Sequence, residues 1–254
     1  MRRLYRIEHQ GAPRHAFERD GRFHLIEGDV FGAYEEGSEI GSEHSRVLAP
    51  VTPSKLVCVG LNYRDHAAEQ GKPLPDEPLL FIKPSTSVIG SGEPIRLPAW
   101  AGRVDHEAEL GVVLGKTASR VRAARASEHI LGLVCVNDVT ARDLQKKDGQ
   151  YTRAKGFDSF APVGPCVAMG LEGRDLQVRG YVNGSLRQDS RTRELIFTIP
   201  ELIEFISSVM TLLPGDIIST GTPAGIGPIR PGDSVTIHVE GIGALTNPVV
   251  ARSD

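Results

Sequence analysis

With 254 residues, the chain is long enough for one large hydrophobic core, or for one domain with a small appendage. Its formal net charge of −3 gives no electrostatic reason to expect a nucleic acid or an anionic membrane as a partner. The 28 glycines and 17 prolines, together with few long periodic helices, predict a β-rich protein with many turns.

Targeting and redox signals indicate a cytoplasmic protein. Residues 1–10 are basic at the start but have no apolar segment, so no signal peptide is expected. The longest apolar run, residues 130–136, is far too short to span a bilayer. Cys58, Cys135 and Cys166 lie in apolar runs without C-x-x-C spacing, so we expect buried free thiols in a reducing compartment.

The first part of the chain predicts a small N-terminal β domain over residues 1–52. Short strands alternate there with turn residues such as Asp20-Gly21, and no cluster of side chains suggests chemistry. Pro50 and Pro53 suit a linker. Residues 53–254 then form a second, larger domain.

A short helix is predicted at residues 63–69, with Asn62 as its N-cap. His66 and Glu69 are three residues apart and therefore lie on one face of this helix. A glutamate beside a histidine orients the ring and raises its basicity, which suits a general base. A surface helix with one ion pair explains the same residues more simply. The proline-rich residues 70–78 predict an exposed flap over a site.

An acidic strand is predicted at residues 104–114. Side chains alternate along a strand, so Asp105, Glu107 and Glu109 share one face, with neighbouring Cα atoms roughly 6.6 Å apart. Two unit charges at that separation repel by about 2.5 kcal/mol at an effective dielectric of about 20. Either this face is solvated, which is usual for such a pattern, or something positive lies between the acids.

An apolar strand at residues 130–136 ends beside Asp138. A polar residue at such a strand end is either a site residue or the N-cap of the helix predicted at residues 140–147, and the cap is the simpler interpretation. On that helix Arg142 and Gln145 lie on one face.

Three further features follow along the chain. Lys155 precedes an extended apolar stretch, which is typical of a charge at the rim of a core. Residues 200–213 predict an amphipathic helix that packs on the core. The glycine-rich turn at residues 220–227 offers backbone N–H groups and hydroxyls, which suits a carboxylate. It lacks Walker A spacing and a following lysine, so we exclude a nucleotide P-loop.

Taken in order, several short motifs resemble those of the fumarylacetoacetate hydrolase family. They are G-L-N-Y-R-D-H-A-A-E, F-I-K-P, V-D-H-E-A-E-L-G-V-V-L-G, N-D-V-T-A-R-D-L-Q, K-G-F-D-S-F-A-P-V-G-P, V-N-G, R-Q-D-S-R-T and G-D-I-I-S-T-G-T-P-A-G-I-G. They follow the family's order from about Lys55 to the C-terminus, roughly four-fifths of the chain. Each motif alone is weak, but the ordered set is specific. The short N-terminal piece resembles the compact bacterial members.

The resemblance implies a β-rich α+β fold whose mixed sheets roll around the active site, and a homodimer. It implies one divalent cation, Mg²⁺ with Mn²⁺ or Ca²⁺ as alternatives, bound by Glu107, Glu109 and Asp138. Three hard oxygen ligands without a cysteine agree with Mg²⁺ or Mn²⁺ over Zn²⁺. Asp105 shares their predicted face but receives no role. His106 is expected to face away from the metal and to be structural.

The same matching implies the remaining site residues. The groups that move protons or place a cation beside the substrate are His66, Glu69 and Lys155. The groups that orient the substrate or hold its carboxylate are Arg142, Gln145, Gly221 and Thr222.

The resemblance also implies a small-molecule 2-oxo acid or diacid as substrate and a metal-stabilised enolate at carbon 3. We expect hydrolysis of a C–C bond in a 2,4-dioxo acid of the acylpyruvate type, because water activation needs the pair of His66 and Glu69. An oxaloacetate-type decarboxylase and a 2-hydroxyhepta-2,4-diene-1,7-dioate isomerase of aromatic catabolism are the alternatives. A non-enzymatic binding protein is the competing class, and no motif residue favours it.

Overall fold

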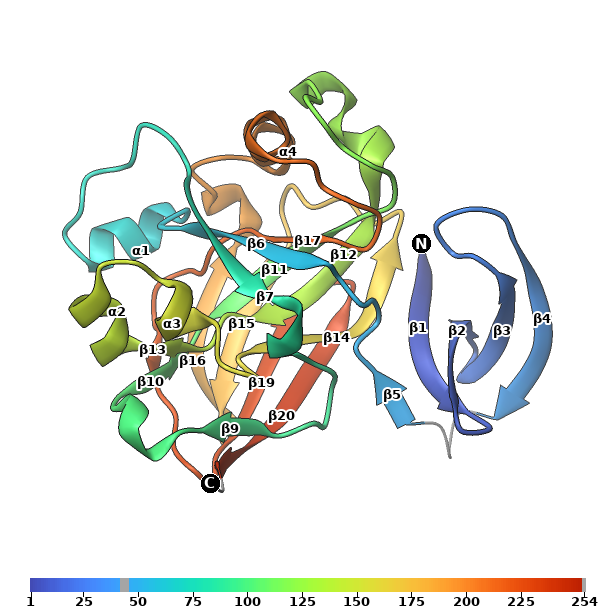
Figure 1. The fold of residues 1–254 in the computed structure, drawn as a ribbon, viewed down its shortest axis with the longest axis horizontal. Helices are drawn as coiled ribbons and strands as arrows, with labels where there is room; N and C mark the ends of the chain where they lie inside the picture. The colour runs from blue at the N-terminus through green and yellow to red at the C-terminus, as the bar shows by residue number, and fades with distance from the viewer. Residues whose placement is uncertain (42–45, 253–254) are drawn as a thin grey trace.

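The protein is β-rich, with short helices at the periphery of mixed β-sheets (Figure 1). Its structure is a computed structural model, which describes residues 1–41 and 46–252. The predicted β-rich α+β fold class with mixed sheets is confirmed. Among the described residues, we find no helix with the length and apolar character that crossing a membrane requires.

The largest sheet extends from one side of the molecule into its interior. From one edge to the other its strands are β4 (Tyr34–Gly41), β3 (Arg22–Gly28), β2 (Ala12–Arg19), β1 (Arg2–His9), β14 (Ala161–Met169), β12 (Ile130–Asn137), β11 (Ala108–Leu114), β17 (Ile217–Ser219), β6 (Lys55–Gly60) and β7 (Leu79–Pro84). Two short strands pair outside this path, β5 (Arg46–Leu48) with β1 and β8 (Val88–Ile89) with β14. Most neighbours are antiparallel, but β17 and β6 are parallel.

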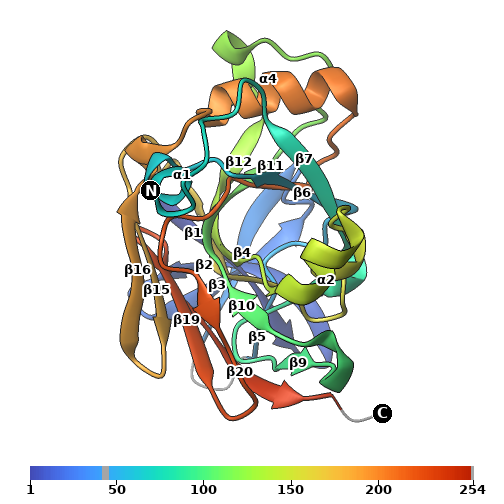
Figure 2. The same cartoon turned by 90° about the vertical axis from the view of Figure 1, so that its left-hand side faces the viewer.

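A second sheet packs against the first and encloses the core. Its strands in order are β16 (Ser185–Arg191), β15 (Gln177–Val182), β19 (Ser234–Val239), β20 (Gly243–Ala251) and β9 (Ile95–Leu97). Figure 2 shows most of this sheet as one orange-to-red layer. Leu110 of β11 and Ile237 of β19 are fully or almost fully buried in the same cluster. A third, small sheet consists of β13 (Thr140–Ala141), β10 (Val104–His106) and β18 (Gly227–Pro228).

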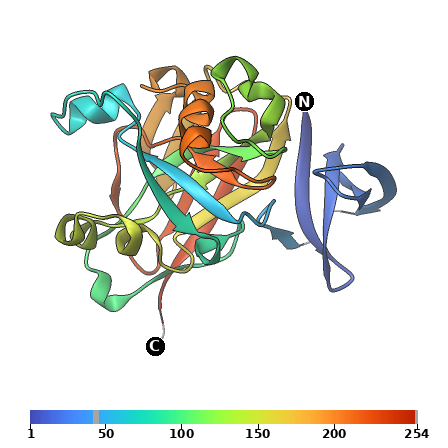
Figure 3. The same ribbon diagram turned by 45° about the horizontal axis from the view of Figure 1, so that its top comes forward.

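The N-terminal strands lie at one side of the molecule (Figures 1 and 3). β1 pairs with β2 and also with β14, so these strands extend the largest sheet. The predicted turn at Asp20-Gly21 is confirmed, and both residues have positive φ, as a two-residue hairpin turn requires. The division into two domains at residue 52 stays a prediction.

The helices surround the sheets. They are α1 (Arg64–Glu69), α2 (Arg142–Asp148), α3 (Thr152–Lys155) and α4 (Ile199–Val209), with 3₁₀ turns at Ser85–Ser87, Ala99–Ala101, Ala123–His129 and Thr192–Glu194. A capping box between Thr198 and Glu201 starts α4. The helix ends before the predicted residue 213, because Met210 is extended and Leu212 pairs with Ala118. The predicted buried free thiols Cys58, Cys135 and Cys166 are confirmed.

The predicted N-cap of α1 is wrong. Tyr63 occupies the N-cap position without a side-chain hydrogen bond. The Asn62 amide instead donates to the carbonyls of Phe197 and Thr220 at 3.1 and 2.8 Å, and its oxygen accepts the N–H of Phe197 at 2.8 Å. Asn62 therefore joins α1 to two distant loops.

Candidate metal centre and active site

Three carboxylates meet in the interior: one oxygen each of Glu107, Glu109 and Asp138 lies within 4.8 Å of the others. Glu109 is on β11, and Asp138 directly follows β12. The strand register pairs Ala108 with Asn137, and the N–H of Asp138 donates to the carbonyl of Glu107 at 3.0 Å. Antiparallel pairing thus brings together acids that are about thirty residues apart in the sequence.

The acidic strand is not continuous as predicted. Glu107 lies between β10 and β11, and the side-chain oxygen of Asn137 accepts its N–H at 3.0 Å. The break moves β10 into the small sheet, so Asp105 is not part of the three-carboxylate cluster. Asp105 instead accepts hydrogen bonds from Arg103 and Arg142. The predicted common face of three acids is therefore wrong at Asp105.

Burial and charge act differently on the acids of the cluster. Burial raises the pKa of Glu109, and the charges of Asp138 and Glu107 raise it further, to about 8. Burial also favours the neutral form of Glu107, but Arg142 and Lys155 outweigh it and hold the pKa of this carboxyl well below its usual range. The surroundings thus favour the charged form of Glu107 and the neutral form of Glu109.

Buried cations explain this asymmetry. Lys155 donates to Oε2 of Glu107 at 2.8 Å and to Oδ2 of Asp138 at 2.5 Å. Lys83, which is fully buried, donates to Oδ1 of Asp138 at 2.6 Å. Arg142 donates to Oε1 of Glu107. Both oxygens of Glu107 and both of Asp138 therefore contact a protein cation.

Glu109 has different partners. Its Oε2 accepts the hydroxyl of Ser219 at 2.5 Å and the N–H of Gly221 at 3.0 Å. In the part of the chain that the structure describes, Glu109 forms no ion pair. A buried carboxylate without a cationic partner, next to two others, fits a divalent cation. The donors are all oxygen, which suits Mg²⁺, Mn²⁺ or Ca²⁺.

The predicted acid/base pair is assembled on α1. His66 is 5% exposed, and its Nδ1 lies 2.8 Å from Oε2 of Glu69. The ring therefore donates Nδ1–H to the carboxylate, which leaves the lone pair of Nε2 to accept the amide of Gln70 at 2.7 Å. The N–H of Gly225 donates to the other oxygen of Glu69 at 3.0 Å.

The glycine-rich loop at residues 220–227 contacts both halves of the site. Gly225 holds Glu69, and Gly221 holds Glu109. The hydroxyl of Thr222 donates to the carbonyl of Ala108 at 3.0 Å and accepts the Gln188 amide at 2.7 Å. The polar groups of the predicted carboxylate cradle thus have partners within the protein, and its role as a cradle stays a prediction.

Arg142 and Gln145 lie together as predicted, because the guanidinium donates Nη1–H to Oε1 of Gln145 at 2.9 Å. His106 points to Gln188, with Nδ1 3.1 Å from its Oε1, and among the described residues its ring forms no hydrogen bond with the three carboxylates. Burial lowers the pKa of His106, which favours the neutral ring. This agrees with a structural role.

Sequence reasoning missed Lys83, Gln70 and Ser219. Lys83 had a signal, since a lysine that ends the apolar run Leu79–Ile82 within a strand needs a buried anion as its partner. No signal in the sequence indicates Gln70 or Ser219, because their partners depend on how α1 and β17 approach the site.

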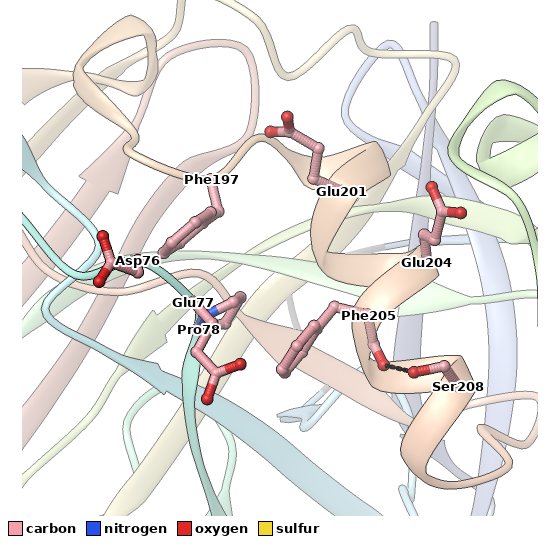
Figure 4. Close-up of a pocket in the computed structure, with 8 residues that line it drawn as sticks. All are labelled: Asp76, Glu77, Pro78, Phe197, Glu201, Glu204, Phe205 and Ser208. Carbon is pink, nitrogen blue, oxygen red and sulfur yellow. Dashed lines mark hydrogen bonds between the residues drawn. The ribbon is translucent and has the colours of Figure 1, made fainter.

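A surface hollow of about 540 Å³ lies apart from these groups, between the predicted flap and α4 (Figure 4). The rings of Phe197 and Phe205 line it together with Asp76 and Glu77. Its lining includes none of the predicted site residues. Two acids on its α4 side have protein partners, since Glu201 caps the helix and Glu204 binds Arg122.

A buried cluster of acids, lysines and an arginine with strongly displaced pKa values is typical of enzymes that bind charged small molecules. Residues 55–250 match the family described as fumarylacetoacetate (FAA) hydrolase, C-terminal. The chain belongs to this family, and it is of the compact type that the sequence predicts.

Two relatives illustrate the range of similarity. Protein Rv2993c of Mycobacterium tuberculosis is 53% identical over 210 residues, which are 82% of this chain and 79% of the relative. The oxaloacetate tautomerase YisK of Bacillus subtilis is 38% identical over 254 aligned residues, covering 89% of this chain and 84% of that protein.

Two solved structures share the fold. The 2-hydroxyhepta-2,4-diene-1,7-dioate isomerase from Mycobacterium marinum superposes with a TM-score of 0.93 at 44% identity, over 100% of both chains. The maleylpyruvate hydrolase from Sphingobium sp. SYK-6, in complex with manganese (II) ion and pyruvate, has a TM-score of 0.83 at 27% identity, over 99% of this chain and 100% of the other.

Proposed function

We propose that the protein catalyses proton transfer at carbon 3 of a 2-oxo acid that carries a second carboxylate, as a tautomerase or isomerase. One observation carries this proposal: the loop at residues 220–227 holds both the His66–Glu69 pair, through Gly225, and the carboxylate cluster, through Gly221. A proton acceptor beside a site for a chelating anion suits enolisation. A tautomerase relative at 38% identity and an isomerase structure at 44% support this choice over hydrolysis, which the sequence favours.

The proton-transfer group is His66. Glu69 holds Nδ1–H, so the imidazole accepts the proton of carbon 3 at Nε2. Gln70 occupies that lone pair in this structure, so its amide moves away when the substrate binds. The same nitrogen returns the proton to the product, which makes the reaction a tautomerisation without net uptake of water.

The buried cations and acids hold the other end of the substrate. Glu107, Glu109 and Asp138 are the residues that would bind a divalent cation, Mg²⁺ first and Mn²⁺ or Ca²⁺ as alternatives. When bound, this cation supplies a Lewis acid for the 2-oxo and carboxylate oxygens. Lys155 adds positive charge where the enolate oxygen develops, and its pKa is raised because Asp138 and Glu107 outweigh the opposing effect of burial.

Groups on α2 and on the glycine-rich loop orient the substrate. Arg142 and Gln145, which are hydrogen-bonded to each other, bind one carboxylate, and the guanidinium donates a charge-assisted hydrogen bond to it. Gly221 and Thr222 border the opposite side, and their polar atoms already support Glu109 and Ala108. We further propose a cytoplasmic homodimer with an N-terminal β domain at residues 1–52 and a catalytic domain at residues 53–254.

Hydrolysis of an acylpyruvate-type 2,4-dioxo acid is the second candidate. The His66–Glu69 pair favours it, because a histidine held by a carboxylate activates water as readily as it accepts a carbon-bound proton. Decarboxylation of oxaloacetate is the third candidate; there the C3–C4 bond breaks, CO₂ leaves, and the electron pair of the bond forms the enolate of pyruvate.

A panel of three substrates separates these reactions. Purified protein is given enol-oxaloacetate, 2-hydroxyhepta-2,4-diene-1,7-dioate and an acylpyruvate, each with Mg²⁺ and with EDTA. Loss of enol absorbance without pyruvate or CO₂ supports proton transfer. Pyruvate release from the acylpyruvate at a higher kcat/KM would reject it in favour of hydrolysis, and CO₂ release from oxaloacetate would reject it in favour of decarboxylation.

A further inference from the structure

Asp105 has an unusual pair of partners for a buried acid. Its side chain is 1% exposed. Oδ1 accepts Nε–H of Arg103 at 2.7 Å, while Oδ2 accepts Arg103 at 3.1 Å and Nε–H of Arg142 at 2.9 Å. One carboxylate therefore holds two guanidinium groups, and no other acid of the described site does so.

Arg142 distributes its donors over three acceptors. Nε–H goes to Asp105, Nη1–H to Gln145, and Nη2–H to Oε1 of Glu107. The backbone supports the same arrangement, because the N–H of Arg142 donates to the carbonyl of Arg103 at 2.8 Å. The side chain of Arg142 is 14% exposed, so most of its surface is in contact with protein.

Of the three contacts of the Arg142 guanidinium, the one with Glu107 is the contact that a bound cation and a substrate carboxylate compete with. Glu107 has one oxygen on Arg142 and the other on Lys155. A divalent cation on Glu107 competes with Arg142 and Lys155 for the negative charge of this carboxylate, which weakens the hydrogen bond from Nη2–H of Arg142. A released Nη2–H then needs another acceptor. The carboxylate of a substrate is such an acceptor, and Asp105 still holds the other edge of the guanidinium.

We infer that Asp105 is a positioning residue that anchors Arg142 through Nε, so that its Nη2–H can exchange Glu107 for a carboxylate of the substrate. The inference rests on the proposed function, because it takes Arg142 as the group that binds the substrate carboxylate. Arg103, whose side chain is 53% exposed, balances the charge of Asp105 from the solvent side and does not reach Glu107. The anchor is thus specific to Arg142.

The test compares Asp105→Asn with Arg103→Gln. Asparagine keeps the shape of the Asp105 side chain and one acceptor oxygen but removes its negative charge. Arg103→Gln leaves Asp105 in place and removes the guanidinium that binds it beside Arg142. Two equilibrium constants are measured: Mn²⁺ binding to the protein by electron paramagnetic resonance of free Mn²⁺, and oxalate binding to the Mn²⁺-loaded protein by calorimetry. Oxalate is a non-reacting dicarboxylate, so the measurement needs no turnover.

We expect Asp105→Asn to lower the affinity for oxalate at least 10-fold, while the affinity for Mn²⁺ changes less than 3-fold. In turnover, the substitution should raise KM more than it lowers kcat. Arg103→Gln should change both affinities less than 3-fold. Equal losses of Mn²⁺ and oxalate affinity in Asp105→Asn would mean a merely structural role and overturn the inference. So would unchanged oxalate binding, or an equal loss in Arg103→Gln.

A double-mutant comparison keeps the inference testable if Asp105→Asn is poorly folded. In an Arg142→Gln background, Asp105→Glu should add less than a 2-fold loss of oxalate affinity, because the anchored group is gone. If the fold-losses of oxalate affinity in the two single variants multiply in the double variant, the inference is overturned. If the protein turns over the proposed substrates but oxalate affinity is the same in all variants, the role of Asp105 is rejected and the proposed function stands. If oxalate affinity changes as expected but no substrate is turned over, only the proposed reaction is rejected.

Discussion

Replacing His66 by alanine tests the proton-transfer site. The imidazole is the proposed general base, and such a base contributes about 10²–10⁴-fold to the rate. At about 1.36 kcal/mol per factor of ten, this is roughly 2.7–5.4 kcal/mol of transition-state stabilisation. The ring donates to Glu69 and accepts from Gln70, and among the described residues it forms no hydrogen bond with the three carboxylates. We therefore expect kcat to fall about 10²–10⁴-fold with Mg²⁺ affinity nearly unchanged.

The assay measures initial rates at saturating Mg²⁺ and Mg²⁺ affinity by calorimetry. Glu69→Gln should lose less activity than His66→Ala, because the base remains but its orienting carboxylate is gone. His129→Ala is a matched control, since its ring forms a hydrogen bond with the carbonyl of Thr117 near the surface and, among the described residues, none with the site. A loss below 10-fold in His66→Ala, or an equal loss of Mg²⁺ binding, would refute the assigned role.

Three further predictions concern the metal and the supports of the site. Exhaustive dialysis against EDTA should abolish turnover and Mg²⁺ or Mn²⁺ should restore it; full activity after chelation would contradict the metal centre. Asn62→Ala removes three hydrogen bonds to backbone groups, so urea unfolding should show a loss of about 3 kcal/mol, at about 1 kcal/mol each, and a loss below about 1 kcal/mol would be inconsistent with this. Burial opposes the charge of Asp216, but the N–H of Leu213, Lys55 and Ser54 hold its pKa below the usual value. Asp216 therefore contributes to the free energy of unfolding above about pH 3.9, the ordinary aspartate pKa, and this contribution is lost as the pH falls further. In Asp216→Asn, the free energy of unfolding should depend less on pH below about pH 4 than in the unchanged protein.

Local features of the site could be predicted from the sequence, because they depend on residues a few positions apart. The spacing of His66 and Glu69 on one helix predicts their contact, and the structure has it at 2.8 Å. The same holds for Arg142 and Gln145 at 2.9 Å and for the turn at Asp20-Gly21. Residue spacing does not predict that Asp138 joins the acids of the preceding strand. That prediction came from the resemblance to the family.

Only the tertiary structure decided which acids meet and which cations face them. Alternation along a strand predicts that Asp105 joins Glu107, yet the chain leaves the main sheet at Glu107, and Asp105 binds arginines instead. Glu109 and Ser219 are 110 residues apart, and they touch because β11 pairs with β17. Strand register and sheet order set such contacts, and no short window of the sequence contains both partners.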